Sequence, residues 1–391
     1  MKRNMLVLGL AAFTLLATNG LTSCGKEEES GETKIAMITD YGDITDQSFN
    51  QSTWEGVKEW GDTNNYKYKY YKPADNSDAS RIASAEKAIE EGYNVIVLPG
   101  YAFAPCINKV APKNKDTKFI ALDVGKGDLL ADYFGKDYDY NPDNTKWNTY
   151  KLPENVYSAV YQEEIAGFFA GYAVAKEGYR KLGFLGGMSV PAVVRYGYGF
   201  VQGVNAAASD ADNFDIKYTY GGQFFGDADI TARTDTWYQG GTELVFACGG
   251  GIYTSACESA TKDGINGKVV GVDVDQKAII ETTYKKEGLC VTSAMKGLKA
   301  TVLSKLTDVV LNKKWTSKIE TLGLVSATEV EKNFVQLPVD TWSMTKFTVE
   351  DYKELVKKVY NGDIKVSNES DSNKHPETKA NVKVEYQSQI K

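Results

Sequence analysis

The sequence has 391 residues, a formal net charge of −7 and a single histidine, His375, in a polar C-terminal stretch. The acidic balance, with no basic run interleaved with aromatic residues to offset it, argues against nucleic acid as a partner. Ser-His and Cys-His nucleophiles, His-ligated metals and most general bases need an imidazole in the fold, so most hydrolases are excluded, whereas an enzyme that uses carboxylates alone is not.

The first predicted element is a secretion signal. Lys2 and Arg3 precede a mostly apolar segment, residues 5–17, which is shorter than a membrane-spanning helix. The segment is followed by Leu21-Thr22-Ser23-Cys24, which resembles a bacterial lipobox. We therefore expect a lipoprotein signal peptide over 1–23, a lipid on Cys24, a linker over 24–33, and a protein anchored on the outer face of the cell membrane. An ordinary secreted protein with an incidental cysteine is the alternative.

Strands and helices then alternate with short connections. The elements predicted for a first lobe are strands 34–39, 66–71, 94–98 and 118–122 and helices 49–60, 78–91 and 101–110. A stretch rich in Asp, Tyr and Asn, residues 128–155, is predicted as a long surface loop. It could lie beside a cleft or simply decorate the surface, and we favour decoration.

The same alternation predicts a second lobe. Its elements are helices 163–176, 193–208, 228–238 and 252–262 and strands 181–185, 214–220, 243–248 and 268–272. Strands separated by helices form a parallel sheet with helices on both faces.

The remaining elements are shared between the two lobes. They are strand 289–294, helix 298–311, an extended run 319–325 and a closing helix 349–360. We predict an α/β fold of two doubly wound parallel-sheet lobes with three hinge crossovers, which favours a limited closing motion. The predicted boundaries are 34–157 plus 293–318 for the first lobe, 158–292 plus 319–361 for the second, and a mobile polar tail over 362–391.

Three aspartates directly follow apolar strands: Asp40, Asp123 and Asp273. Because ligands bind parallel sheets at the carboxyl ends of the strands, these side chains are predicted to point at a cleft. An aspartate after a strand can also be a turn residue or a helix cap, but three together favour the cleft.

Four cysteines follow the signal segment: Cys106, Cys248, Cys257 and Cys290. They could form up to two disulfides outside the cytoplasm. Cys248 and Cys290 lie in apolar runs, however, which favours small buried thiols. No Cys-x-x-Cys spacing indicates a metal, and the glycines at 249–251 lack the Gly-x-Gly-x-x-Gly pattern of a dinucleotide site, so neither metal nor cofactor is expected.

Several motifs occur in order along the chain. They are Ile38-Thr39-Asp40, Asp46-Gln47-Ser48-Phe49-Asn50-Gln51, Phe119-Ile120-Ala121-Leu122-Asp123, Glu163-Glu164 with Phe168-Phe169-Ala170-Gly171, Gly271-Val272-Asp273, and Thr292-Ser293 with Lys296. From about residue 34 to about residue 360 the chain resembles the basic membrane protein family of lipoproteins, whose members include purine nucleoside receptors of ABC importers. The resemblance implies a type I periplasmic-binding-protein fold and a protein that is not an enzyme.

The resemblance also implies where a base would bind. Phe49 and Phe225 would sandwich its ring, with Phe224 as the alternative to Phe225. Asp46 and Asp123 would accept hydrogen bonds from the edge of the base.

The sugar would bind beside the base. Asp273 and Lys296 would hold its hydroxyl groups with Asp40 close by, and Asp275 is the alternative to Asp273. Gly250 would let backbone N–H groups approach the ribose. The family more often has Gly-Gly-Thr-Gly at this loop, so the chain departs from the pattern there.

The sequence thus predicts a monomeric, lipid-anchored substrate-binding protein that delivers a nucleoside, most of all a purine nucleoside, to an ABC permease. Three alternatives stay open. The first is a receptor of the same fold for a sugar or another small polar solute, the second a nucleoside hydrolase that uses carboxylates alone, and the third a lipoprotein that signals or adheres.

Overall fold

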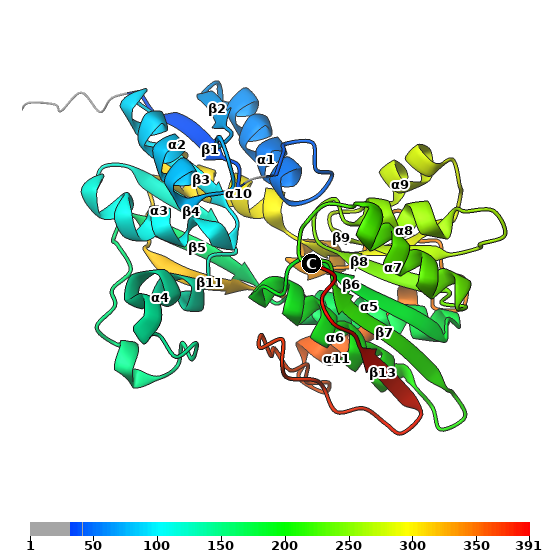
Figure 1. Ribbon diagram of the computed structural model, residues 1–391. Coiled ribbons are helices and arrows are strands. Elements are labelled where there is room, and N and C mark those ends of the chain that lie inside the picture. Colours follow the sequence, from blue (N-terminus) through cyan, green and yellow to red (C-terminus); the bar gives the residue numbers. More distant parts are fainter. Residues whose placement is uncertain (1–31, 41) are drawn as a thin grey trace, which may run out of the picture. The chain divides into compact units, whose positions relative to one another are not determined.

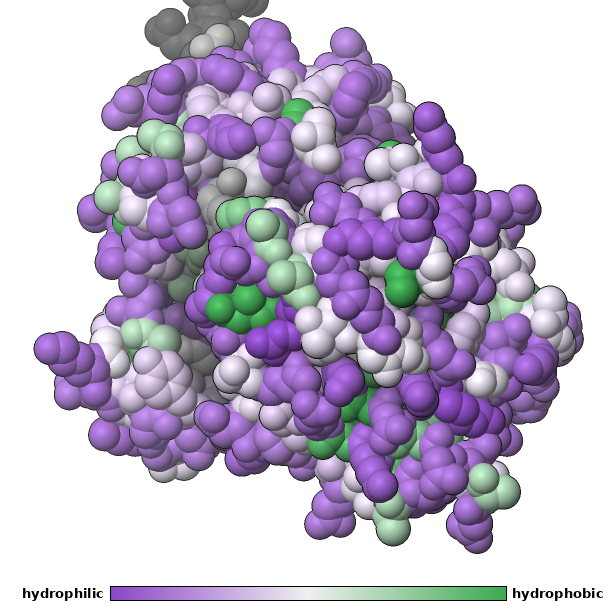
Figure 2. Space-filling model, turned by 45° about the vertical axis from the view of Figure 1, so that its right-hand side comes forward, coloured by the Kyte–Doolittle hydropathy of each residue, from purple (hydrophilic) through white to green (hydrophobic). Residues whose placement is uncertain are grey.

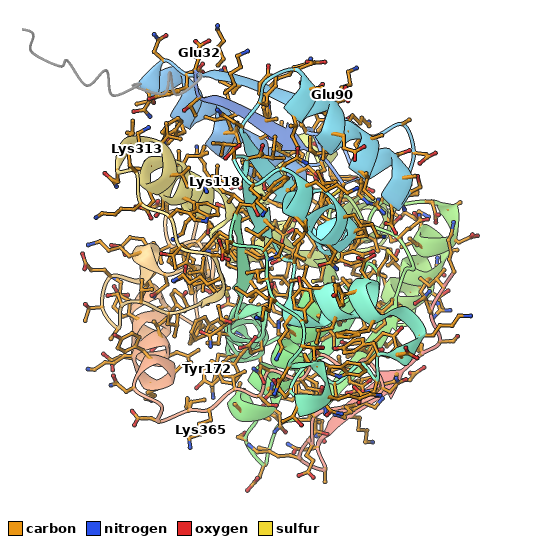
Figure 3. The ribbon with its side chains drawn as sticks, turned by 90° about the vertical axis from the view of Figure 1, so that its left-hand side faces the viewer. Glu32, Glu90, Lys118, Tyr172, Lys313 and Lys365 are labelled. Atoms are coloured by element: carbon orange, nitrogen blue, oxygen red, sulfur yellow. The ribbon has the colours of Figure 1, made fainter. Side chains whose placement is uncertain are left out.

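The computed structural model describes residues 32–40 and 42–391. The predicted signal peptide, Cys24 and most of the linker over 24–33 therefore lie outside the described residues. Within the described part, the strands form two sheets, one in each predicted lobe (Figure 1). Figure 3 gives a side view, in which Lys118 at the start of β4 and Tyr172 on α5 mark the two lobes.

The first sheet has the order β11-β5-β4-β3-β1-β2, with every pair parallel. Alternate residues of its strands belong to two different cores: Met37 lies in the core that includes Trp60 of α1, whereas Ile38 lies in the core on the opposite face that includes Ile107 of α3. The elements of this lobe are β1 (Lys34–Ile38), α1 (Phe49–Asn64), β2 (Lys67–Tyr71), α2 (Asp78–Glu90), β3 (Val95–Pro99), α3 (Ala104–Lys109), β4 (Lys118–Leu122), α4 (Lys126–Phe134), β5 (Val156–Tyr161), α10 (Leu298–Leu306) and β11 (Lys318–Leu322).

The second sheet has the order β12-β10-β9-β8-β6-β7-β13 and is parallel except for the antiparallel pair of β10 and β12. Phe184 packs with Phe200 of α6 on one face, and Leu185 with Trp237 of α7 on the other. The elements are α5 (Glu163–Glu177), β6 (Lys181–Gly186), α6 (Pro191–Ala207), β7 (Phe214–Tyr220), α7 (Ala228–Gln239), β8 (Leu244–Cys248), α8 (Tyr253–Ala260), β9 (Lys268–Asp273), α9 (Lys277–Tyr284), β10 (Cys290–Lys296), β12 (Val335–Gln336), α11 (Val349–Tyr360) and β13 (Val382–Tyr386).

Among the described residues the chain passes between the sheets three times: after β5, after β10 and after β11. The doubly wound two-lobe fold with three crossovers is therefore as predicted. The boundaries are not. Strand β5 contains the predicted boundary at 157/158, β10 belongs to the second sheet although 293–318 was assigned to the first lobe, and β11 pairs with β5 although 319–361 was assigned to the second lobe. A short run with mixed polarity indicates a strand but not its partner.

Two segments predicted to lack structure are folded. The stretch 128–155 includes most of α4, and its Trp147 packs with Leu130 and Tyr138 in a small separate core. The tail 362–391 contributes β13, which pairs in register with β7 along the edge of the second sheet. The prediction of a mobile polar tail is therefore wrong for 382–386.

The face shown in Figure 2 is mostly hydrophilic, with small separate hydrophobic areas. None of the helices in the described part of the chain combines the length and apolar character of a membrane span. The four cysteines among the described residues are all buried free thiols, which resolves the open question of their pairing.

Candidate functional site

A cavity of about 1480 Å³ lies where strand ends of both sheets meet. Asp40 and Asp123 follow β1 and β4 of the first sheet, while Asp273 and Lys296 end β9 and β10 of the second. The cavity exceeds the volume of about 300–1,000 Å³ typical of small-molecule pockets. Each of the eight predicted binding residues lines it: Asp40, Asp46, Phe49, Asp123, Phe225, Gly250, Asp273 and Lys296.

Lys296 is the centre of a buried ionic cluster. Its ammonium donates a hydrogen bond to Asp123 Oδ2. It also lies 3.5 Å from Asp273 Oδ1 and 3.6 Å from Glu163 Oε1. Although burial alone would lower it, the pKa of Lys296 is raised by these carboxylates. The lysine therefore keeps its charge and holds Asp123 of the first lobe close to Asp273 of the second.

Asp123 and Asp273 share a backbone conformation that few residues adopt. Their φ angles are 58° and 65°, in the left-handed region that Asp and Asn tolerate better than most other residues. Burial raises the pKa of Asp123 to about 6, against the opposing charge of Lys296. Its Oδ1 is buried and has no hydrogen-bond partner among the described residues. Burying such an oxygen costs free energy unless a donor pairs with it.

Arg195 of α6 offsets the negative charge of Glu163 and Glu164, the first two residues of α5. Its Nε donates to Glu163 Oε2 at 2.7 Å and lies 3.9 Å from Glu164 Oε2. Burial, together with the neighbouring Glu163, raises the pKa of Glu164 to about 7. We did not predict Arg195 as a site residue. The available signal was its place in the first turns of a helix that follows a parallel strand, at the end of the sheet where ligands bind.

A close crossing of α5 and α6 fixes where these side chains lie. A Cβ on Gly167 would lie 2.1 Å from the carbonyl oxygen of Tyr196, and a Cβ on Gly199 would lie 2.0 Å from that of Glu164. Only glycine allows two helix backbones to approach so closely. The crossing thereby holds Arg195 and Tyr196 in the wall of the cavity.

Phe49 is the first residue of α1, and Asp46 holds this end of the helix. Asp46 Oδ1 accepts from the backbone N–H groups of Ser48 and Gln51, at 2.9 and 3.0 Å. Its Oδ2 accepts from the backbone and side-chain nitrogens of Asn50, both at 2.9 Å. Each oxygen thus already has two donors, which differs from the predicted contact with a base. The bonds instead suit a cap that positions Phe49.

Two further aspartates are distinguished by their contacts. Asp40 lines the cavity, and its Oδ1 accepts from Gly42 N at 2.6 Å and from Asn50 Nδ2 at 3.1 Å, which shapes the loop before α1. Asp275, the alternative to Asp273, accepts from the Thr341 hydroxyl at 2.6 Å and does not line the cavity.

The two phenylalanines that follow β7 differ in how closely their rings are packed. The Phe224 ring packs so closely that a Cβ on Gly187 or Gly249 would lie 2.4 or 2.8 Å from it. Phe225 is 53% exposed. It forms a bridge with Gly251, and Gly250 has a φ of 50° that favours glycine. Phe225 is therefore the ring with a face available for stacking.

Two segments remote from each other in sequence also line the cavity. Residues 138–143 come from the long stretch before β5, and residues 367–371, with Asn373 and Lys374, come from the C-terminal stretch of the chain (Figure 1). The purely decorative role that we favoured for 128–155 is therefore wrong for 138–143. Both segments carry acids, and acidic side chains outnumber basic ones along the whole lining.

Hydrogen bonds also join the lobes beside the cavity. The Ser48 hydroxyl donates to Asp273 Oδ2 at 2.6 Å, and Gln276 Nε2 donates to the carbonyl oxygen of Gln47 at 3.0 Å. The end of β9 is thus tied to the residues that begin α1. Asp273 is therefore hydrogen-bonded to Ser48, the residue that precedes Phe49.

The wall leaves several buried polar atoms without hydrogen-bond partners among the described residues. They are Asp123 Oδ1, Glu164 Oε2 and the hydroxyl groups of Tyr138 and Tyr196. Such atoms are costly to bury unless something pairs with them. No group of three or more His, Cys, Asp or Glu side chains in the described part of the chain is arranged to hold a metal ion.

Comparison with known proteins gives the family. The model of the Bmp family, described as "ABC transporter substrate-binding protein PnrA-like", matches residues 33–370. The chain belongs to this family. It is 28% identical to the ABC transporter nucleoside-binding protein BmpA of Lactococcus lactis subsp. cremoris over 69% of this chain and 74% of that protein. It is 26% identical to Basic membrane protein A of Borreliella burgdorferi, over 71% and 72% of the two chains.

Solved structures agree with the fold. A solute-binding protein of an ABC transporter system from Aeropyrum pernix K1 superposes with a TM-score of 0.67 at 18% identity, covering 87% of this chain and 95% of that one. One from Conexibacter woesei reaches 0.62 at 18% identity, covering 86% and 99%. The fold is that of type I periplasmic binding proteins, and the chain is a substrate-binding component of the ABC transporter class.

Proposed function

We propose that this protein captures a nucleoside, above all a purine nucleoside, between its lobes and presents it unaltered to the permease of an ABC importer. The observation that carries the proposal is the make-up of one cavity. Phe49 of the first lobe and Phe225 of the second both line it, together with the ionic cluster around Lys296. The similarity to BmpA of Lactococcus lactis, an ABC transporter nucleoside-binding protein, supports the same ligand class.

The aromatic rings supply the stacking surfaces. The Lys296 ammonium lies over the Phe49 ring, 4.6 Å from its centroid, and so occupies one face of that ring. The opposite face is left for a flat heterocycle, and the exposed ring of Phe225 supplies the second surface. A base between them would draw the two lobes together.

The polar groups suit the edges of the base and the sugar. Asp123 Oδ1, which has no partner among the described residues, accepts an N–H of the base. Asp273 and Lys296 bind sugar hydroxyl groups, since a carboxylate accepts and an ammonium donates. These bonds are complete only when both lobes contact the ligand, so the ligand favours the closed state.

The test begins with the protein purified without added ligand. Mass spectrometry of the material released on denaturation is expected to identify a purine nucleoside. Titration calorimetry then compares a purine nucleoside, its free base and free ribose. The nucleoside should bind most tightly, because only it reaches both the rings and the sugar groups. Equal affinity for base and nucleoside would contradict the sugar role of Asp273.

The same materials separate the alternatives. Tight binding of monosaccharides without nucleosides would establish a sugar receptor of the same fold. Release of free base from a bound nucleoside, followed by chromatography, would establish a hydrolase that uses carboxylates. An unaltered nucleoside after prolonged incubation is the result that a transport protein predicts.

We propose further that the protein acts as a monomer held at the outer face of the membrane by a lipid on Cys24. Replacement of Cys24 by serine is expected to move the protein from the membrane fraction into the medium. Recovery of the Cys24→Ser protein in the membrane fraction would contradict the anchor. Light scattering of the purified protein tests the monomer.

A further inference from the structure

Tyr196 is held rigidly in the wall of the cavity. It lies in α6, where the close crossing at Gly167 fixes its backbone. Its side chain is 1% exposed, and its ring meets Phe246 edge to face, with centroids 6.0 Å apart and an angle of 89°. Lys296 Nζ lies 5.7 Å from the centroid of the same ring. The hydroxyl group therefore cannot leave the site to find water.

The hydroxyl of Tyr196 has no hydrogen-bond partner among the described residues. Other buried tyrosines differ: the Tyr161 hydroxyl bonds to Thr301 at 2.8 Å, and the Tyr352 hydroxyl accepts from Leu337 N at 2.9 Å. A phenylalanine at 196 would make the same ring contacts without an unpaired polar atom. The hydroxyl thus adds nothing to the packing of the protein itself.

The surroundings keep this hydroxyl protonated. Burial and the nearby carboxylates of Asp273, Glu163 and Asp123 raise the pKa of Tyr196 well above its ordinary value. A protonated tyrosine can donate as well as accept. Tyr196 and Asp273 also share a neighbour, because Lys296 Nζ lies 5.7 Å from the centroid of the Tyr196 ring and 3.5 Å from Asp273 Oδ1. One chemical group suits such a pair, since an aliphatic hydroxyl can donate to a carboxylate and accept from a tyrosine at the same time.

We propose that Tyr196 is a ligand-contacting, specificity-determining residue whose hydroxyl donates to one hydroxyl oxygen of the sugar while Asp273 accepts the proton of that same hydroxyl. The inference rests on the proposed function, since it names a group of the nucleoside that the site selects. A ligand that lacks this hydroxyl leaves both Tyr196 and Asp273 without their partner.

The experiment compares Tyr196→Phe with Tyr352→Phe, a control outside the cavity. Titration calorimetry uses adenosine or guanosine, whichever the wild-type protein binds better, and its 2′-, 3′- and 5′-deoxy analogues. Tyr196→Phe is expected to weaken nucleoside binding roughly 3- to 10-fold. Its thermal stability without ligand should equal or exceed that of the wild type. Tyr352→Phe should show the reverse, a lower melting temperature with unchanged affinity.

The deoxy analogues identify the contact. For one of the three, wild type and Tyr196→Phe should bind equally, because the partner of the tyrosine is already missing. Unchanged nucleoside affinity of Tyr196→Phe, or an equal loss with all three analogues, would overturn the inference while leaving the proposed function standing. Failure of the wild type to bind any of the nucleosides would instead overturn both.

Discussion

Replacement of Lys296 by methionine tests the ionic cluster most directly. At 3.5 Å from Asp273 Oδ1 and 3.6 Å from Glu163 Oε1, the ammonium attracts each by about 4–5 kcal/mol at an effective dielectric constant of about 20. The substitution also removes the desolvation cost of the lysine itself. The expected net loss in the free energy of unfolding is about 3–5 kcal/mol at pH 8, because buried carboxylates are left without compensation.

The loss in the free energy of unfolding caused by Lys296→Met should be larger at high pH than at low pH. The pKa of Asp123 is already about 6 in the folded protein, above its ordinary value of 3.8, and loss of the ammonium raises it further. A carboxyl whose pKa is higher in the folded state destabilises that state when it ionises, so stability falls as pH rises from the unfolded pKa to the folded one. The deficit of Lys296→Met is therefore largest at pH 8 and shrinks at pH 5.

Urea unfolding, followed by tryptophan fluorescence at pH 5 and pH 8, measures the free energy of unfolding of the wild type and of Lys296→Met. Lys305→Met is the matched control, since Lys305 also has two acidic neighbours, Glu320 at 3.5 Å and Asp308 at 3.7 Å, but its side chain is 22% exposed. The control should lose no more than about 1 kcal/mol. The reasoning fails if Lys296→Met loses no more than the control at pH 8, or loses the same at both pH values.

Three further predictions concern the cavity and its support. Phe49→Ala should weaken nucleoside binding by about 1–3 kcal/mol through lost stacking, and unchanged calorimetric affinity would refute that role. The nucleoside affinity of the wild type should fall about tenfold between pH 7 and pH 5, because Asp123, with its pKa of about 6, becomes protonated. Asp123→Asn, in which asparagine tolerates the left-handed backbone, should bind the nucleoside weakly at both pH values. An equally steep dependence of affinity on pH in this variant would count against Asp123. Gly199→Ala should lower the free energy of unfolding by about 1–3 kcal/mol or more, since the added Cβ meets the carbonyl oxygen of Glu164 at 2.0 Å. The control Gly127→Ala places its Cβ an ordinary 3.5 Å from the nearest atom, and equal stability of the two variants would show that α5 and α6 can separate freely.

Much of the fold follows from local pattern. Apolar runs such as Ile35-Ala36-Met37-Ile38 are buried on both faces of a parallel sheet, so their composition alone indicates central strands. The edge strands of the sheets are harder to predict. In β11 the run Lys318-Ile319-Glu320-Thr321-Leu322 is half exposed, and nothing in its residues specifies β5 as its partner. The alternation of Val382, Val384 and Tyr386 was a signal for β13 that we did not use.

Some residues of the candidate site could be predicted from the sequence, and others could not. Asp123 and Asp273 were predictable because their position after a strand fixes which end of the sheet they reach. The role of Asp46 was not, since a carboxylate before a helix reads equally as a cap or as a ligand contact, and only its hydrogen bonds distinguish the two. Tyr196 also escaped prediction. Its sequence context is that of a buried helix residue. Its significance lies in a hydroxyl group that has no hydrogen-bond partner among the described residues, which only the structure reveals.

The ionic cluster also makes the binding site and the contact between the lobes one structure. Asp123 follows β4 of the first sheet and Lys296 ends β10 of the second, so their ion pair joins the two lobes in the lining of the cavity. A ligand that donates to Asp123 Oδ1 favours the ionised carboxylate, and this in turn strengthens the attraction to Lys296. By linkage, a ligand that donates to Asp123 and the ammonium of Lys296 favour the same ionised state of this carboxylate. We therefore propose that ligand binding and lobe closure are coupled through this carboxyl group.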